Sequence, residues 1–333
     1  MKSTVYTQDV LQGRQVISQL NVATLAAGCH HFWFQVPQNG IGQHTHLPVV
    51  VYHGEETGPK VMITAGVHGD ELNGVITAQK VIQRLAEQCV QGTVVIVPGI
   101  NVSGMLQHTR DFMPSDPDAS PTNLNRIFPG NSAGDSANRF VASVWSDLLE
   151  GNADFAIDLH TQTRGAAYPL YVFADYRLEQ AVKMARLMQP DVIFDDPGDD
   201  GVLETQWNQT GVPSITVEVG AGKLLQPDLI NRSVEGIFNI LKAEGLIAGV
   251  ICESNVDCYE GKEVISIRAV VGGFGLPQVV IGDKVEQGQL VAVQYDSFGG
   301  EIQRYHAPIN GYVLSVNQDP MRESGTLLVR LIQ

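Results

Sequence analysis

The sequence is short of basic residues. It contains 21 lysine and arginine residues against 36 aspartate and glutamate residues, which gives a formal net charge of −15. A chain with this charge is repelled by the phosphate backbone of nucleic acids and by anionic lipid surfaces. We therefore expect neither nucleic acid nor a membrane among its partners. Individual arginines can still bind a small carboxylate, because local geometry rather than net charge decides such a site.

Long apolar segments are also missing. No apolar run approaches the roughly 20 residues that span a bilayer, and the opening stretch MKSTVYTQDV lacks the apolar core of a signal peptide. The four cysteines (Cys29, Cys89, Cys252 and Cys258) show no CxxC spacing. This favours reduced, mostly buried thiols over a disulfide framework. Together these features predict a cytoplasmic protein.

What the sequence does have is an alternation of two patterns. From Val61 onward, short apolar runs such as VMITAGV, TVVIVPGI and PSITVEVG alternate with longer helical patterns such as ELNGVITAQKVIQRLAEQ. Buried strands separated by helices predict an α/β domain with a mostly parallel central sheet. Residues 1–50 alternate polar and apolar positions and predict further strands that lead into this core. We assign residues 1–249 to this domain.

The pattern changes after residue 249. Residues 250–333 read as short strands punctuated by glycine, which predicts a small all-β domain. Its segments GDKVEQGQLVAV and APINGYVLSV resemble the two halves of a biotinyl or lipoyl-type barrel-sandwich. The turn between them, YDSFGG, has no lysine, so neither group can be attached there. We expect this domain to act as a lid, a spacer or an interface in a homo-oligomer.

Two strand ends carry residues that bind metals. His68 and Glu71 follow the apolar run VMITAGV, and His160 ends the run FAIDLH. Ligands bind at the carboxyl ends of strands in open α/β sheets, and two histidines with one carboxylate are a common catalytic zinc set. Asp158 is placed to orient the ring of His160. Each motif alone is more often surface polarity or a helix cap, so the metal prediction depends on their combination.

A further acidic residue has the position of a catalytic base. Glu218 lies at the end of the run SITVEVG, which is too apolar to hold a carboxylate without a purpose, unless the strand end is open to solvent. Zinc lowers the pKa of a bound water molecule toward 7. A carboxylate beside that water can accept its proton and pass it to a leaving amine.

A long loop rich in proline, serine and aspartate follows TVVIVPGI and contains Arg110, Asn125 and Arg126. Arginine holds a carboxylate through paired hydrogen bonds and also polarises a carbonyl as negative charge builds on it. The competing interpretation is that these side chains are ordinary solvated residues of a surface loop.

The motifs GVHGDE, NLNR, DLHT and VEVG occur in this order, and together they resemble the succinylglutamate desuccinylase and aspartoacylase family, relatives of the zinc carboxypeptidases. The resemblance covers about residues 45–245. It implies a zinc carboxypeptidase-like fold with one zinc ion per chain. By the same resemblance, the zinc ligands are His68, Glu71 and His160, and Glu218 is the general base.

The resemblance also implies roles for the arginines. Arg110 would polarise the scissile carbonyl, while Asn125 and Arg126 would hold the carboxylate of the substrate. Arg164, in HTQTRG, lies where desuccinylase-like members also carry an arginine and is a further expected substrate contact. Residues 110–125 form a longer segment than in aspartoacylase itself, so the shape of the substrate pocket does not follow from the resemblance.

We therefore predict a zinc-dependent deacylase that hydrolyses the amide bond of a small N-acyl amino acid or a related N-acyl amine. Two alternatives stay open. The same zinc set could serve a carboxypeptidase that acts on short peptides, or the site could bind a metal and a small molecule without turnover. Glu218 argues against the second alternative, because a binding protein does not need a base beside the metal.

Overall fold

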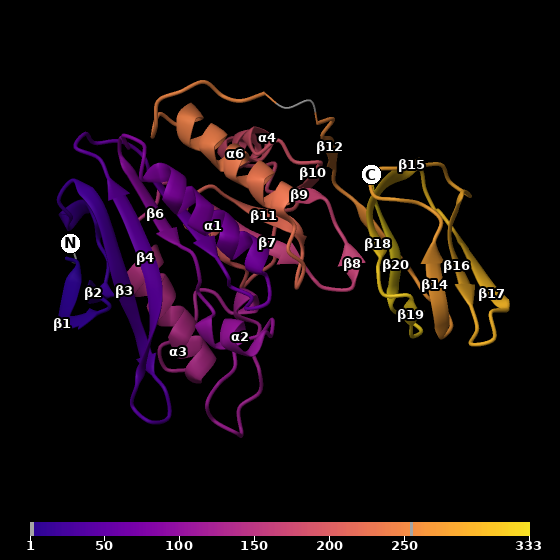
Figure 1. The fold of residues 1–333 in the computed structure, drawn as a ribbon, viewed down its shortest axis with the longest axis horizontal. Helices are drawn as coiled ribbons and strands as arrows, with labels where there is room; N and C mark the ends of the chain where they lie inside the picture. The colour runs from indigo at the N-terminus through magenta and orange to yellow at the C-terminus, as the bar shows by residue number, and fades with distance from the viewer. Residues whose placement is uncertain (1–2, 254–255) are drawn as a thin grey trace.

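The computed structural model describes residues 3–253 and 256–333, and its largest element is an eleven-stranded sheet (Figure 1). The strands lie in the order β1-β2-β3-β4-β6-β5-β7-β11-β9-β10-β12. Their bounds are β1 Val5–Leu11, β2 Arg14–Gln19, β3 Gly28–Gln38, β4 His44–His53, β5 Lys60–Ala65, β6 Thr93–Val97, β7 Phe155–Gln162, β9 Leu170–Ala174, β10 Val192–Asp195, β11 Ser214–Ala221 and β12 Tyr259–Gly261.

The centre of this sheet is parallel. Strands β6, β5, β7 and β11 run in the same direction, each paired with the next. On one side β4 pairs antiparallel with β6, and on the other side β9 pairs antiparallel with β11. The predicted α/β class with a mostly parallel sheet is confirmed. The strands expected within residues 1–50 extend the sheet at the N-terminal end (Figure 1).

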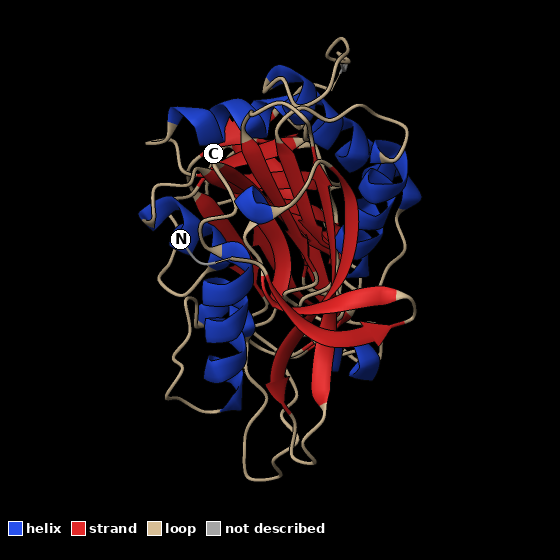
Figure 2. Cartoon of the chain, turned by 90° about the vertical axis from the view of Figure 1, so that its left-hand side faces the viewer, coloured by secondary structure: helices blue, strands red, loops and turns tan. Residues whose placement is uncertain are grey.

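Helices cover both faces of the sheet (Figure 2). Buried side chains of α1, α4 and α6 form one core with the sheet, and those of α3, the π-helix and α5 form a second core on the opposite face. The bounds are α1 Leu72–Leu85, α2 Val102–Gln107, α3 Ser136–Ser143, the π-helix Val144–Leu149, α4 Glu179–Leu187, α5 Leu203–Gln209 and α6 Pro227–Ala243, with 3-10 turns at Val22–Thr24 and Leu124–Arg126. In α1 the buried Val75, Ala78, Val81 and Leu85 recur every three or four residues, which produces the single apolar stripe that packs on the sheet.

The C-terminal residues form two smaller antiparallel sheets, which confirms the predicted all-β unit. Their strands are β13 Val264–Arg268, β14 Gly273–Pro277, β15 Lys284–Val285, β16 Leu290–Tyr295, β17 Glu301–His306, β18 Gly311–Asn317, β19 Met321–Arg322 and β20 Leu327–Ile332. The short strand β8, Ala166–Ala167, follows the carboxyl end of β7 and pairs with β18. The small sheets lie at the end of the molecule opposite the N terminus (Figure 1), while β12 still pairs with β10 of the large sheet.

The cysteines are not buried as expected. Cys29, Cys89 and Cys252 are exposed and Cys258 is partly buried, although all four are free thiols. The burial prediction is wrong because these residues lie at the start of a strand or in connecting segments, which run over the surface. In the described part of the chain, no helix is long and apolar enough to cross a membrane.

Gly74 sets the distance between α1 and the sheet. A Cβ atom at this position would lie 2.7 Å from the carbonyl oxygen of Leu159 in β7. We expect Gly74→Val to lower the free energy of unfolding by about 1–3 kcal/mol through overpacking, seen as a lower midpoint in thermal unfolding. Gln79→Val, at an exposed position of the same helix, is the control for the lower helix propensity of valine. Equal midpoints for the two variants would contradict this account of the packing.

Candidate metal centre and active site

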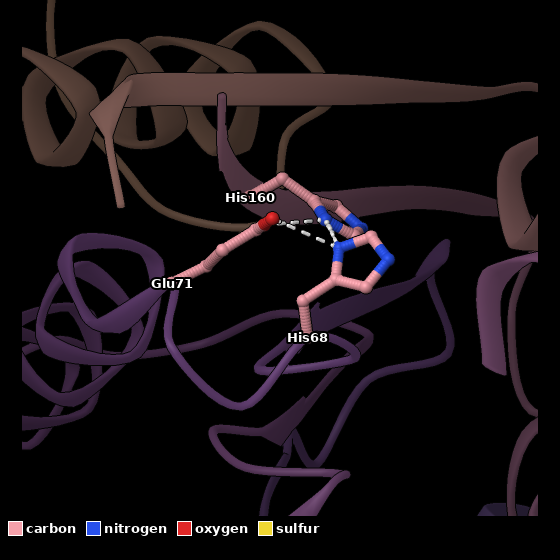
Figure 3. A group of neighbouring side chains, drawn as sticks. All are labelled: His68, Glu71 and His160. Carbon is pink, nitrogen blue, oxygen red and sulfur yellow. Dashed lines mark hydrogen bonds and ion pairs between the residues drawn. The ribbon is translucent and has the colours of Figure 1, made fainter. Parts of the chain in front are cut away.

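Three donor groups meet at the carboxyl ends of β5 and β7 (Figure 3). These neighbouring strands are parallel, and Ala65, the last residue of β5, pairs with Leu159, so His68 and His160 come to the same edge of the sheet. Glu71 is the residue that precedes α1. Its Oε1 lies 3.0 Å from His68 Nδ1 and its Oε2 lies 2.8 Å from His160 Nδ1, while the two histidine nitrogens are 3.1 Å apart.

The opposite nitrogen of each histidine ring has its own partner. Asp158 Oδ2 lies 2.7 Å from His160 Nε2, and Asp158 Oδ1 accepts a hydrogen bond of 2.6 Å from the hydroxyl of Thr64. Asn123 Oδ1 lies 2.9 Å from His68 Nε2. Such contacts fix the tautomer and the orientation of a ligand histidine. The predicted role of Asp158 beside His160 therefore matches the geometry, whereas Asn123 was not predicted.

The donor set fits a metal ion. The ligand atoms of His68, Glu71 and His160 all lie within 4.8 Å of one another, and each of these residues is at most 2% exposed. Both Nε2 atoms are engaged with Asp158 and Asn123, so the Nδ1 lone pairs and the carboxylate are directed at one shared point. Two imidazoles and one carboxylate leave a coordination position open, which is the composition of catalytic rather than structural sites.

The charged groups of this cluster change one another's pKa values. Burial opposes the charged form of His160, but the carboxylates of Asp158 and Glu71 outweigh burial and raise its pKa well above the usual range. Burial also opposes the charged form of Glu71, yet the neighbouring histidines lower its pKa. For His68 burial dominates and lowers the pKa. Glu71 is thus a carboxylate at neutral pH, as a metal ligand must be.

Glu218 lies on the strand next to His160. In the parallel pairing of β11 with β7, Glu218 is directly opposite His160. The side chain is 7% exposed, and burial together with the charge of Glu71 raises its pKa to about 8. Gln162 Nε2 donates a hydrogen bond of 2.8 Å to Glu218 Oε1, while Oε2 has no hydrogen-bond partner among the described residues. One carboxyl oxygen is therefore held by a hydrogen bond, and the other is buried with its hydrogen-bonding capacity unused.

The loop residues Arg110, Asn125 and Arg126 line the same cavity as the donor set and Glu218. The guanidinium of Arg110 forms an ion pair with Glu71 Oε1. Asn125 is buried, and its Oδ1 accepts a hydrogen bond of 2.8 Å from the backbone N–H of Leu203 at the start of α5. Arg126 is exposed, and its guanidinium donates to the carbonyl of Asn125 at 2.7 Å.

Arg164 lies apart from this cavity. It is exposed and lines a neighbouring pocket with His108, Arg110 and Lys223. Arg110 borders both pockets. The sequence-predicted residues are therefore brought together around the donor set, except for Arg164, which adjoins it.

Sequence reasoning missed several residues of the cavity. Gln162 contacts Glu218, the loop between β10 and α5 adds the carboxyl groups of Asp196 and Asp199 to the lining, and α5 adds that of Glu204. The stretch DDPGDD is a run of acidic and turn-forming residues, and this composition was the available signal. Nothing in the stretch indicates that it lines the same cavity as the histidines, because this arrangement depends on how distant segments pack.

Asp158 is expected to tune metal affinity without being a ligand. Asp158→Asn removes the negative charge next to His160 Nε2 while keeping the side-chain shape. We expect zinc affinity to fall about 10–100-fold, measured by competition with a chromophoric chelator. Asp118→Asn, at an exposed loop position, is the matched control. Unchanged affinity in Asp158→Asn would show that the Asp158–His160 contact has no role in metal binding.

The fold and the site define a class of protein: an α/β chain with a buried group of two histidines and a glutamate that could hold a metal ion at the carboxyl edge of its sheet, and with a further acidic residue beside it. Residues 57–243 match the family model of the succinylglutamate desuccinylase/aspartoacylase catalytic domain, which covers more than half of the chain. The chain belongs to the succinylglutamate desuccinylase/aspartoacylase family, a family of deacylases, and the resemblance seen in its motifs is confirmed.

Individual proteins agree with this assignment. The N-alpha-acetyl-L-2,4-diaminobutyric acid deacetylase of Halomonas elongata is 29% identical over 270 residues, which are 75% of this chain and 74% of that protein. The product-bound structure of the ectoine utilization protein EutE (DoeB) from Ruegeria pomeroyi superposes with a TM-score of 0.80 at 20% identity, over 92% of this chain and 95% of that one. A succinylglutamate desuccinylase/aspartoacylase from Rhodobacter sphaeroides superposes with a TM-score of 0.80, 20% identity and coverage of 92% and 96%. These two structures are similar in fold.

Proposed function

We propose that the protein is a zinc-dependent deacylase that hydrolyses the amide bond of a small N-acyl amino acid. The observation that carries this proposal is the carboxyl group of Glu218, which lies in the same cavity as the donors His68, Glu71 and His160. Only one of its two oxygens has a hydrogen-bond partner among the described residues. A carboxyl group that is buried in the same cavity as a set of metal-binding side chains, and has one oxygen without a hydrogen-bond partner, suits proton transfer better than structural support.

Zinc is the metal we propose for this site, with one ion per chain. Two imidazoles and one carboxylate are ligands that zinc favours, although other divalent ions accept similar sets. Bound there, zinc would act as a Lewis acid that polarises the carbonyl of the substrate and makes water a better nucleophile.

Residues of the chain would carry out the proton transfer and stabilise the negative charge that forms on the substrate. Glu218 takes a proton from the attacking water through Oε2 and passes it to the nitrogen of the leaving amine, while Gln162 keeps Oε1 in place. A cation held next to this carboxyl group favours its charged form, which is the form that accepts a proton. The guanidinium of Arg110 has further N–H donors beyond its contact with Glu71, and these would stabilise negative charge on the carbonyl oxygen.

The substrate would be held by the other polar groups of the cavity. Arg126 would pair with its carboxylate, and Asn125 would donate through Nδ2, since its Oδ1 is used by Leu203. Arg164, in the adjoining pocket, would contact a more distant part of the substrate. The cavity has a volume of about 260 Å³, below the roughly 300–1,000 Å³ of typical ligand pockets. This size favours a single acylated amino acid over a peptide.

We further propose that residues 1–249 form the deacylase domain and residues 250–333 an all-β domain in a cytoplasmic protein, with β12 as the strand that still joins the large sheet. The pairing of β8 with β18 supports a spacer or lid, because β8 begins only a few residues after His160. The homo-oligomer stays a prediction from the sequence.

Release of free amine from a panel of N-acetyl, N-succinyl and N-formyl amino acids tests the deacylase. We expect zinc-loaded protein to hydrolyse one acyl class, because one small cavity must hold both the acyl group and the amino acid. The Halomonas elongata relative is named as an acetyl-amino acid deacetylase, so N-acetyl derivatives are the first to test. Amine release would be followed with an amine-reactive fluorophore.

Two further arms of this experiment separate the alternatives. Dipeptides with blocked and free N termini are included, and release of C-terminal residues from them alone would establish a carboxypeptidase instead. Tight binding of an N-acyl amino acid by calorimetry, with no product from any compound, would establish a binding protein. Either result overturns the proposed deacylase.

A further inference from the structure

The C-terminal domain is attached to the chain close to the metal-binding histidine His160. Three residues, Thr163, Arg164 and Gly165, separate β7 from β8, and we call them the β7–β8 turn. The two residues of β8 pair antiparallel with the last two residues of β18 (Figure 1). A contact with the C-terminal domain therefore begins within a few residues of His160.

One backbone carbonyl of the β7–β8 turn is surrounded by donors from the C-terminal domain. The oxygen of Gly165 accepts a hydrogen bond of 2.7 Å from Arg322 Nη2 in β19. It also accepts from the backbone N–H groups of Gln318, at 3.0 Å, and Asp319, at 3.4 Å. A carbonyl oxygen has two lone pairs, and a charged donor such as a guanidinium forms the stronger bonds. Arg322 is therefore the side chain that anchors the turn.

Arg322 is committed to this contact. In the part of the chain that the structure describes, its guanidinium has no carboxylate within ion-pair distance, and Gly165 is its hydrogen-bond partner. Its Nε is buried without a hydrogen-bond partner among the same residues. A buried N–H that stays unpaired costs free energy. Such departures from the most stable arrangement are typical of functional positions.

The donors of the C-terminal domain are held in place before any substrate binds. Asn317 is only 4% exposed, and its Nδ2 donates to the carbonyl oxygens of Gly275, at 3.0 Å, and Asp319, at 3.1 Å. These bonds fix the bend that presents the two backbone N–H groups to the turn. Arg322 is fixed as well, because β19 pairs with β14. The anchor is therefore arranged in advance, which lowers the cost of binding.

The other end of the turn is fixed by the large sheet. The carbonyl of Gln162, the last residue of β7, accepts a hydrogen bond of 2.7 Å from the backbone N–H of Gly222. Arg164 lies between these two fixed points, and its exposed guanidinium forms no ion pair within residues 3–253 and 256–333. The position of Arg164 beside Arg110 in the adjoining pocket therefore depends on the turn rather than on an ion-pair partner.

We infer that Arg322 is a positioning residue for substrate binding, which acts through the carbonyl of Gly165 to hold Arg164 in the pocket next to the candidate metal site. This inference rests on the proposed deacylase function and gives the C-terminal domain a part in it. A side chain on a fixed turn loses less freedom when it binds a ligand. Removing the anchor should therefore weaken substrate binding, while Gln162 and Glu218 keep their own contact and proton transfer continues.

A double-mutant cycle tests whether Arg322 acts through Arg164. Arg322→Met removes the guanidinium and keeps a long side chain, and Arg164→Ala removes the expected substrate contact. The assay is amine release by the zinc-loaded protein from whichever compound of the N-acetyl, N-succinyl and N-formyl panel it hydrolyses fastest. We expect Arg322→Met to raise KM about three- to tenfold with a much smaller change in kcat, and Arg164→Ala to raise KM about tenfold.

The double variant distinguishes positioning from a structural role. Its KM should equal that of Arg164→Ala alone, because an anchor has no effect once the side chain that it positions is gone. If Arg322 were merely structural, the two effects would multiply, and that result would overturn the inference. An unchanged KM in either single variant would overturn it as well.

Two further variants separate the anchor from the loss of an arginine as such. Arg268→Met is the matched control, because Arg268 is exposed and its Nη1 donates at 3.0 Å to the carbonyl of Gly325, within the C-terminal domain. It should leave KM unchanged. Arg322→Lys keeps a charged donor near Gly165 and should bring KM back towards that of the unmodified protein. A rise in KM for Arg268→Met as large as for Arg322→Met would contradict a specific anchor.

Hydrogen exchange followed by mass spectrometry tests the anchor without any substrate. The amides of the β7–β8 turn and of β8 should exchange faster in Arg322→Met than in the unmodified protein, since exchange reports local opening. Arg268→Met should match the unmodified protein in this segment. Unchanged exchange in Arg322→Met would show that Arg322 does not hold the turn and would overturn the inference.

This inference and the deacylase proposal fail in different ways. Hydrolysis of a panel compound with independent effects of the two substitutions leaves the deacylase standing and removes the positioning role. If no compound is hydrolysed, the deacylase fails, and the role of Arg322 in substrate binding fails with it even where exchange confirms the anchor.

Discussion

Glu218→Gln is expected to lower kcat by a factor of about 10²–10⁴, the range that positioned proton transfer contributes. Glutamine keeps the shape of the side chain and its contact with Gln162, but it cannot accept a proton from water. The variant should still bind zinc, since Glu218 is not among the three converging donors. The loss should therefore appear in kcat, with a much smaller change in KM.

The measurement is amine release under saturating substrate, with the zinc content of each preparation determined by atomic emission. Glu235→Gln is the matched control, because Glu235 lies on the surface of α6 and pairs with Arg84. If Glu218→Gln kept the turnover of the unmodified protein, another group would have to be the base. A fall in zinc content would instead make Glu218 a metal-site residue.

His160→Ala is expected to abolish both metal binding and activity. The substitution removes one of three ligands and leaves Asp158 and Glu71 as buried carboxylates without their shared partner. Breaking a buried ion pair in this way typically costs about 3–5 kcal/mol of stability. We expect a lower unfolding midpoint and no stabilisation on addition of zinc, whereas metal bound to the native state raises the midpoint of the unmodified protein.

Thermal unfolding with and without added zinc, together with amine release, checks this expectation. His306→Ala, at an exposed position in β17, is the control for loss of a histidine as such. Treatment of the unmodified protein with a strong chelator should reproduce the loss of activity, and zinc should restore it. Full activity after the metal has been removed and its absence verified would contradict a metal-dependent reaction.

The sequence by itself determined the fold class and the centre of the site. Apolar runs and helical patterns have periods that can be counted along the chain, and they predict the α/β core and the C-terminal strands. His68, Glu71, His160 and Glu218 each lie at the end of such a run or within a few residues after it. Because parallel strands bring their carboxyl ends to one edge, the meeting of these residues follows from strand order without any knowledge of packing.

Only the tertiary structure decided which side chains hold His68 and Glu218 in place and which residues line the rest of the cavity. Asn123 reaches His68, and Gln162 holds Glu218, through contacts that no spacing indicates. Arg164 came to line the adjoining pocket, although its motif follows His160 directly. The carboxyl groups of Asp196 and Asp199 reach the cavity from the loop between β10 and α5, about 130 residues after His68, and that of Glu204 reaches it from α5. Loop conformation depends on docking against distant segments rather than on a repeating pattern, and for this reason these acidic residues of the cavity were visible only in three dimensions.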